Sequence, residues 1–301
     1  MDAALEVANL SKAFNGTQIV DDVSFSVKAG EVFGLIGPNG AGKTTTIRLA
    51  LQIIQPDAGE VSLFGRPMDS LALERIGYLP EERGLYRHAQ AFEVLEYLGR
   101  LKGLTSRDAR RRAGEVLDLL GMTEHSHKKI SELSRGMSQL IQFGSTIIHE
   151  PELVILDEPF SGLDPVNTLR LKDLVHDLEG RGATVIFSTH LMNHVEELCD
   201  RVLMINHGKS VLYGSVGEIK ERYRNNSLYI RWNGPLKSMV TVDRWVLRDG
   251  YFEAYLSDDA TPELALQEIL VLGGTLRHFE LSTPSLNEVF IRVAGEAETD
   301  E

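Results

Sequence analysis

Cysteine is almost missing from the sequence: Cys199 is the single cysteine among 301 residues. One cysteine cannot form an internal disulfide, and it has no second cysteine with which to bind a metal. Disulfide-stabilised folds and cysteine-cluster metal sites are therefore excluded, and a reducing compartment such as the cytosol is favoured.

Long hydrophobic runs are also missing. The best apolar run, Leu153–Leu156, ends at Asp157, whereas a membrane-spanning helix needs about 20 mostly apolar residues. The first residues, 1–6, lack a basic segment followed by a hydrophobic core, so we expect no signal peptide. The sequence predicts a chain without a membrane span of its own.

Positive charge is in deficit, with 31 Lys and Arg against 44 Asp and Glu and a net charge of −13. Such a surface repels nucleic acid and anionic lipid in general, although a local basic patch remains compatible with it. The arginine run at 107–112 is followed by acidic residues on an expected helix, which is typical of a solvated helix face. Composition is otherwise ordinary, which argues against disorder, collagen and coiled coil.

Apolar patterning indicates an α/β core. The first 30 residues alternate apolar and polar side chains, which predicts antiparallel strands around a turn at Asn15-Gly16. The short apolar runs 31–36, 153–156 and 184–187 predict buried strands, each followed by a helical stretch. Alternating strands and helices favour a largely parallel sheet.

The pattern changes near residue 220. We expect an α/β domain over 1–220, with a helical subdomain at about 85–145, and a small α+β domain over 221–301, joined at 221–226. The smaller domain is predicted from strands at 227–233, 239–247, 250–256 and 275–282 and helices at 262–272 and 284–294.

A phosphate-binding loop is predicted at Gly37–Thr44, which fits the pattern G-x-x-x-x-G-K-[ST] between an expected strand and helix. Glycines let successive backbone N–H groups point at a phosphate, and the helix presents its positive N-terminal end to the anion. Lys43 would neutralise the β- and γ-phosphates, and Thr44 would offer its hydroxyl to Mg²⁺.

Two adjacent carboxylates follow the buried run 153–156. Asp157 and Glu158 stand at the carboxyl end of an expected parallel strand, where α/β sheets bind ligands. Asp157 suits a Mg²⁺ ion or its water ligands, and Glu158 suits a general base that activates a water molecule.

Five segments in this order resemble the motifs of ATP-binding cassette (ABC) ATPases, over about residues 5–215. They are Gly37–Thr44, Leu133–Met137, Leu153–Glu158, Ser161–Asp164 and Ser188–His190. The fold that the resemblance implies is a P-loop ABC ATPase core, with a parallel sheet, antiparallel N-terminal strands and a helical subdomain, followed by the α+β domain.

The resemblance also implies roles for single residues. Phe14 would stack on adenine, although a strand-edge aromatic is the alternative. Ser134 and Gly136 would cap the γ-phosphate held by a second subunit, and Asp164 would cross that dimer interface. His190 would contact the γ-phosphate.

Together, the residues and the resemblance give the following candidate site. The catalytic set is Lys43, Glu158 and His190; the metal set is Thr44, Asp157 and Glu81; the nucleotide set is Phe14, Gly37, Pro38, Asn39, Gly40, Ala41, Gly42, Lys43, Thr44, Thr45, Ser134, Gly136 and Asp164.

Three positions depart from the usual ABC pattern. Glu81 stands where the family usually has glutamine, unless the alignment shifts by one to Glu82. A glutamate still ligates a hard cation, but it adds negative charge and cannot donate as an amide does. Arg135 and Met137 replace the usual glycine and glutamine. The serine–glycine pair of the signature is kept, so we expect ATP hydrolysis to persist.

These departures are similar to the exporter branch of the family, which includes sodium, drug and antibiotic exporters. The segments Tyr78–Tyr86 and Ser282–Phe290 resemble that branch and the end of its C-terminal module. The module would support the cassette dimer, or else regulate it or bind a partner.

The family resemblance also implies a groove for the permease at about 85–130. Helical spacing of Phe92, Val94, Leu95, Leu98 and Leu101 predicts core positions, and some of these apolar side chains would then be exposed at that groove.

We interpret the sequence as the ATP-binding, ATP-hydrolysing subunit of an ABC transporter, peripheral on the cytoplasmic face of a membrane. Expected partners are transmembrane permease subunits and a second ABC subunit, identical or not, with ATP and Mg²⁺ as cofactors and no nucleic acid. Two alternatives are an ABC ATPase acting on ribosomes or nucleic acid, and a regulatory module that binds ATP but hydrolyses it weakly.

Overall fold

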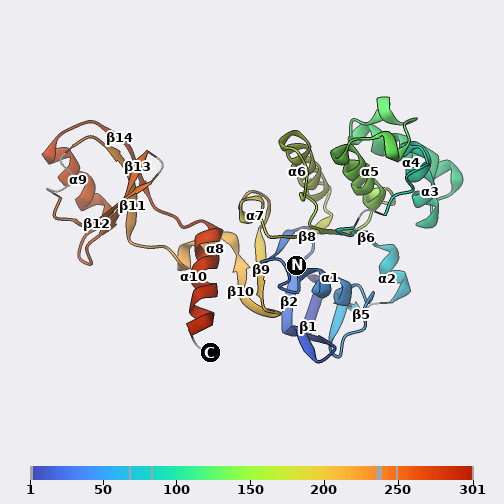
Figure 1. The fold of residues 1–301 in the computed structure, drawn as a ribbon, viewed down its shortest axis with the longest axis horizontal. Coiled ribbons are helices and arrows are strands. Elements are labelled where there is room, and N and C mark those ends of the chain that lie inside the picture. The colour runs from blue at the N-terminus through green and yellow to red at the C-terminus, as the bar shows by residue number, and fades with distance from the viewer. Residues whose placement is uncertain (1–2, 68, 83, 235–238, 249, 300–301) are drawn as a thin grey trace. The chain divides into compact units, whose positions relative to one another are not determined.

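A computed structural model describes residues 3–67, 69–82, 84–234, 239–248 and 250–299 (Figure 1). The chain forms two compact units, Met1–Val216 and Gly217–Glu301. The division falls at the start of helix α8 (Val216–Arg222), ahead of the expected joint at 221–226. Among the described residues, no helix combines the length and apolar character needed to cross a membrane.

The N-terminal sheet has the strand order β2-β1-β4-β5. The predicted antiparallel hairpin is confirmed, because β1 (Ala3–Phe14) pairs with β2 (Thr17–Lys28) around Asn15 and Gly16. Both turn residues have positive φ, 50° and 82°, as a tight two-residue hairpin loop requires. The strands β4 (Ala58–Leu63) and β5 (Arg66–Pro67) complete this sheet.

The central sheet has the order β10-β9-β3-β8-β7-β6, and its strands are parallel except for β10. Their bounds are β3 (Val32–Ile36), β6 (Ile76–Leu79), β7 (Leu153–Asp157), β8 (Thr184–Thr189), β9 (Arg201–Asn206) and β10 (Lys209–Ser215). Every residue of β3, β7 and β8 is buried. The predicted parallel α/β core is confirmed.

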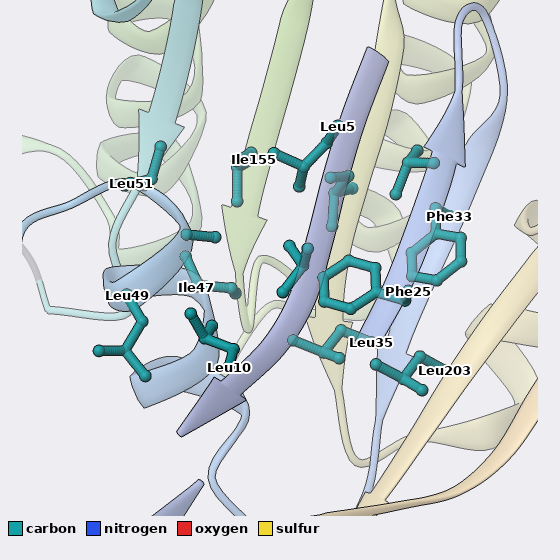
Figure 2. Close-up of a cluster of buried hydrophobic side chains, with 14 of the residues drawn as sticks. Leu5, Leu10, Phe25, Phe33, Leu35, Ile47, Leu49, Leu51, Ile155 and Leu203 are labelled. Atoms are coloured by element: carbon teal, nitrogen blue, oxygen red, sulfur yellow. The ribbon is translucent and has the colours of Figure 1, made fainter. Parts of the chain in front are cut away.

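One hydrophobic core joins the two sheets to helix α1 (Lys43–Ala50). Figure 2 shows Leu5 and Leu10 of β1, with Leu35 of β3 and Ile47 of α1, converging in this cluster. Close packing of these side chains fixes β3 relative to α1, and so fixes the turn that connects them.

Helices fill the segments between the later strands. They are α2 (Ser70–Glu74), α3 (Ala91–Leu101), α4 (Ser106–Leu119), the 3₁₀ turns Thr123–His125 and Ile130–Glu132, α5 (Arg135–Ile147), α6 (Pro165–Gly180) and α7 (Met192–Leu198). Val94 and Leu95 are buried as predicted, but Leu101 is 63% exposed. Leu101 ends α3, where the chain turns toward α4, so it is not a core residue and is instead one of the apolar side chains of this segment that were expected to be exposed.

The second unit contains an antiparallel sheet of order β12-β13-β11-β14. Its elements are β11 (Ser227–Trp232), β12 (Val242–Arg248), β13 (Tyr251–Leu256), α9 (Pro262–Leu272), β14 (Leu276–Leu281) and α10 (Leu286–Thr299). Ala265 and Ile269 of α9 pack against Leu228, Ile230 and Trp232 of β11. The predicted α+β module therefore has its own hydrophobic core.

Candidate functional site

The turn between β3 and α1 requires glycine at two positions. Gly37 has a φ of 152°, and a Cβ there would collide with the carbonyl oxygen of Ile205. Gly42 has a φ of 107°, and a Cβ would lie 2.7 Å from the carbonyl oxygen of Ile19. Gly42 also caps α1 without a side chain, which leaves the first-turn N–H groups available to an anion.

The Lys43 ammonium is buried at this turn. Its Nζ donates to the carbonyl oxygens of Gly37 (2.9 Å) and Pro38 (3.1 Å). The same Nζ lies 3.4 Å from Oε1 of Glu158, which is also buried. A buried cation is thus paired with a buried carboxylate, an arrangement in which both charges interact strongly with any ion that enters.

Asp157 presents one satisfied and one unsatisfied oxygen. Its Oδ1 accepts hydrogen bonds from the hydroxyls of Thr44 (3.1 Å) and Ser188 (2.5 Å). Its Oδ2 is buried and has no hydrogen-bond partner among the described residues. Burial raises the pKa of Asp157, and the two hydroxyls oppose this shift. A buried carboxylate oxygen beside a threonine hydroxyl fits the oxygen ligands that Mg²⁺ takes.

Glu158 has a φ of 48°, an uncommon conformation for a residue with a side chain. Its backbone N–H donates to Oγ of Ser188 (2.9 Å), and its carboxylate lies 3.1 Å from Nδ1 of His190. His190 is partly exposed. The arrangement holds the Glu158 carboxylate between one buried cation, Lys43, and one accessible imidazole.

Ser188 orients both acidic residues, yet the sequence analysis assigned it no role. Its hydroxyl accepts from the Glu158 backbone and donates to Asp157. The parallel register of β7 and β8 places Ser188 directly beside Asp157. Strand register is the signal that identifies this residue.

Most predicted catalytic and loop residues share one cavity of about 540 Å³. Its lining includes Asn39, Gly40, Gly42, Lys43, Thr44, Thr45, Glu81, Glu158 and His190. An adjacent cavity of about 130 Å³ brings Glu81 together with Asp157 and Glu158. Loop and acidic residues that are far apart in sequence therefore meet at the carboxyl edge of the parallel sheet.

The predicted signature residues Ser134 and Gly136 and the predicted interface residue Asp164 lie together at the starts of α5 and α6. Ser134 caps α5 by accepting from the N–H of Met137 (3.2 Å), and Asp164 caps α6 by accepting from that of Asn167 (3.0 Å). That backbone hydrogen bond lowers the pKa of Asp164. A Cβ on Gly136 would collide with the Asn167 amide. The residues that line the cavity around Lys43 do not include Ser134, Gly136 or Asp164.

Phe14 also lies apart from that lining. It ends β1 and is exposed, with the Lys12 ammonium 5.6 Å from its ring centroid. An exposed ring stacked by a cation is compatible both with a nucleotide platform and with a strand-edge aromatic.

The glycine turn after β3 and the carboxylates that end β7 define a P-loop ATPase. A family model described as ABC transporter matches residues 20–161, and one described as ATP-binding protein DrrA1-3-like, C-terminal domain, matches residues 214–294. A model described as AAA domain, putative AbiEii toxin, Type IV TA system matches the shorter range 129–195.

Full-length relatives make the assignment specific. The chain is 39% identical over 295 residues to the uncharacterized ABC transporter ATP-binding protein YhaQ of Bacillus subtilis, covering 97% of this chain and 98% of YhaQ. It is therefore an ATP-binding subunit of the ABC transporter family, a family of ATPases.

Two further likenesses agree with this assignment. The chain is 31% identical over 311 residues to the daunorubicin/doxorubicin resistance ATP-binding protein DrrA of Streptomyces peucetius, covering 99% and 94% of the two chains. A solved ATP-binding subunit of an ABC transporter superposes with a TM-score of 0.67 at 30% identity, over 73% of this chain and 93% of that one.

Proposed function

We propose that the chain drives export of a substrate through separate transmembrane subunits, on the cytoplasmic face of the membrane. The export direction is supported by the drug-resistance name of DrrA and by the match of residues 214–294 to a DrrA-like domain. ATP hydrolysis would supply the energy. Motions of the dimer that accompany ATP binding and hydrolysis would transmit this energy to the transmembrane subunits.

The dimer would be head to tail. Ser134 and Gly136 begin helix α5, whose N–H groups and dipole favour an anion. They lie outside the lining of the Lys43 cavity, so in this proposal a second chain would bring its own α5 end to the nucleotide. Phe14 would stack on the adenine, and Asp164 would lie at the interface between the two chains.

Hydrolysis would be carried out by four groups of the larger cavity. Lys43 and the loop amides would hold the β- and γ-phosphates, exchanging the carbonyl contacts of Lys43 for phosphate oxygens. A carboxylate oxygen of Glu158 would accept the proton of the attacking water. His190, in contact with Glu158 through Nδ1, would orient the terminal phosphate.

Magnesium would be held by Thr44 and Asp157, with Glu81 as a further carboxylate. The partnerless Oδ2 of Asp157 and the adjacent Thr44 hydroxyl fit such an ion. When bound, Mg²⁺ neutralises phosphate charge.

The observation that carries the transport proposal is an exposed aromatic groove formed by residues 86–97, at the start of helix α3 and in the loop before it. Tyr86 and Tyr97 are 54% and 46% exposed, with their ring centroids 5.5 Å apart. With Val94 they line a mostly apolar hollow of about 500 Å³. Clustered aromatic side chains at a concave surface are typical of protein-binding sites.

The test is affinity purification of the tagged chain from solubilised membranes, beside the variants Tyr86→Ala/Tyr97→Ala and Lys43→Ala. We expect a polytopic membrane protein with the wild type and with Lys43→Ala, but not with the double tyrosine variant. The partner should also stimulate ATPase activity. Recovery of ribosomal proteins instead would support the ribosome alternative, and recovery of a soluble dimer alone would contradict the transporter proposal.

A further inference from the structure

Helix α5 carries two amide side chains that are directed toward the protein interior. Gln139 and Gln142 lie one helical turn apart, and both are buried, whereas Arg135, one turn before Gln139, is exposed. Their neighbours Leu140, Ile141 and Phe143 are buried apolar residues. Buried amides are costly unless they are hydrogen bonded, so their partners indicate why they are present.

Both glutamines donate to backbone carbonyls next to candidate site residues. The Nε2 of Gln142 donates to the carbonyl oxygen of Glu82 at 3.1 Å, one residue after Glu81. The Nε2 of Gln139 donates to the carbonyl oxygen of Pro159, one residue after Glu158. One helix face therefore holds the two loops that carry Glu81 and Glu158.

The two contacts meet at the smaller cavity, of about 130 Å³. Gln139, Gln142 and Arg135 line it on the side of α5, facing Glu81, Asp157 and Glu158. The Arg135 guanidinium also packs against Gly162, where a Cβ would lie 2.5 Å from its Cζ. Helix α5 thus contributes two amide side chains and one cationic side chain to the lining of a cavity that three carboxylates also line.

We propose that Gln142 is a positioning residue for ATP hydrolysis. Its amide N–H fixes the loop at Glu82, and through that loop it fixes the Glu81 side chain in the catalytic cavity. Helix α5 packs against α3, and α3 carries Tyr97 of the aromatic groove. The same hydrogen bond therefore makes the position of Glu81 depend on the positions of α3 and α5. The inference rests on hydrolysis at Glu158 as proposed above.

The test compares Gln142→Met in the full chain with the wild type, because methionine keeps the volume and removes the donor. We expect kcat to fall about tenfold, with KM for ATP and fluorescent-nucleotide affinity changed less than twofold. The matched control is Thr146→Val, since the Thr146 hydroxyl on the same helix donates within α5, to the carbonyl oxygen of Gln142. Its kcat should stay within twofold of the wild type.

A double-mutant cycle separates positioning from a general loss of structure. In the Glu81→Ala background, Gln142→Met should cause less than a twofold further loss of kcat. A tenfold loss in both backgrounds would overturn the proposal, as would wild-type kcat in Gln142→Met. If Gln142→Met lowers the unfolding midpoint, Gln142→Leu replaces it in the same double-mutant cycle, and the same changes in kcat support or overturn the proposal. A wild-type chain without ATPase activity would instead contradict the proposed hydrolysis.

Discussion

At the residue scale, the proposed hydrolysis depends most on the Glu158 carboxylate. The carboxylate is buried beside the Lys43 ammonium and contacts His190, and the Glu158 backbone has a strained φ of 48°. Strained backbone persists where surrounding contacts hold it, and such positions cluster at functional sites. Glutamine keeps the shape of this side chain but cannot accept a proton.

We therefore expect Glu158→Gln to reduce steady-state ATP turnover by about 100-fold or more, the contribution of a general base. ATP affinity should stay within about threefold, because Lys43 and the glycine turn are unchanged. Phosphate release and fluorescent-nucleotide titration measure the two quantities. Turnover in Glu158→Gln comparable to the wild type would remove Glu158 from the mechanism.

His149 gives a pH-dependent stability. Its Nε2 donates to the carbonyl oxygen of Ile76 at 3.1 Å, which also accepts from Nζ of Lys102. Burial, with the nearby Lys102 charge, lowers the pKa of His149 to about 4. The unfolded chain, with a pKa of about 6.5, then binds a proton that the folded chain does not, so stability falls as pH falls from about 7 toward 4.

Glutamine at position 149 keeps an N–H donor and does not titrate. Between pH 7.5 and 4.5 the wild type should lose about 2 kcal/mol more unfolding free energy than His149→Gln. Urea unfolding at the two pH values measures this difference. Equal losses in both proteins would show that His149 does not titrate as its burial requires.

At the residue scale, the sequence predicts which side chains meet at the site when they belong to strong local motifs. Lys43, Thr44, Asp157 and Glu158 meet as expected, because each follows a strand whose end is set by an apolar run. Contacts between distant segments have no such local pattern. Arg112 was expected on a solvated face, but it is only 15% exposed and donates to the carbonyl oxygen of Ile148.

At the scale of elements, the start of α5 meets the start of α6 through Gly136. A Cβ there would collide with the Asn167 amide and lie 3.3 Å from the Asp164 carboxylate. We expect Gly136→Ala to displace the two helix ends and to lower kcat more than tenfold. ATP affinity should change less than threefold, since the glycine turn after β3 lies elsewhere.

Gly114→Ala is the matched control, because no atom lies within 4 Å of a Cβ at this position of α4. Alanine in a helix interior should stabilise the protein by about 0.5–1 kcal/mol and leave kcat unchanged. ATPase assays and thermal unfolding of both variants provide the comparison. Normal turnover in Gly136→Ala would separate this helix junction from hydrolysis.

Strands and helices could be predicted where a single period of apolar residues dominates a segment. The alternation in residues 3–28 and the apolar run of β7 identify strands, because burial of one face or of both faces leaves a distinct pattern. The pairing order β3-β8-β7-β6 joins strands that are far apart in the sequence, and no single-segment pattern specifies such neighbours. For the same reason, the sequence analysis did not find the contacts of Gln139 and Gln142.

At the scale of the whole molecule, each unit has its own core. The residues of the large cluster, from Leu5 to Ile205, all belong to Met1–Val216. The cluster around Trp232 belongs to Gly217–Glu301. Two separate cores indicate two units able to fold without each other's side chains.

Every candidate nucleotide contact, from Phe14 to His190, lies in the first unit. A fragment of residues 1–216 should therefore fold and bind ATP with an affinity within about threefold of the full chain. Fluorescent-nucleotide titration measures this, and Lys43→Ala in the same fragment should abolish binding, because it removes the cation that would hold the phosphates. If the folded fragment binds ATP poorly while the full chain binds well, the second unit contributes to the nucleotide site, and its function is then more than that of an accessory module.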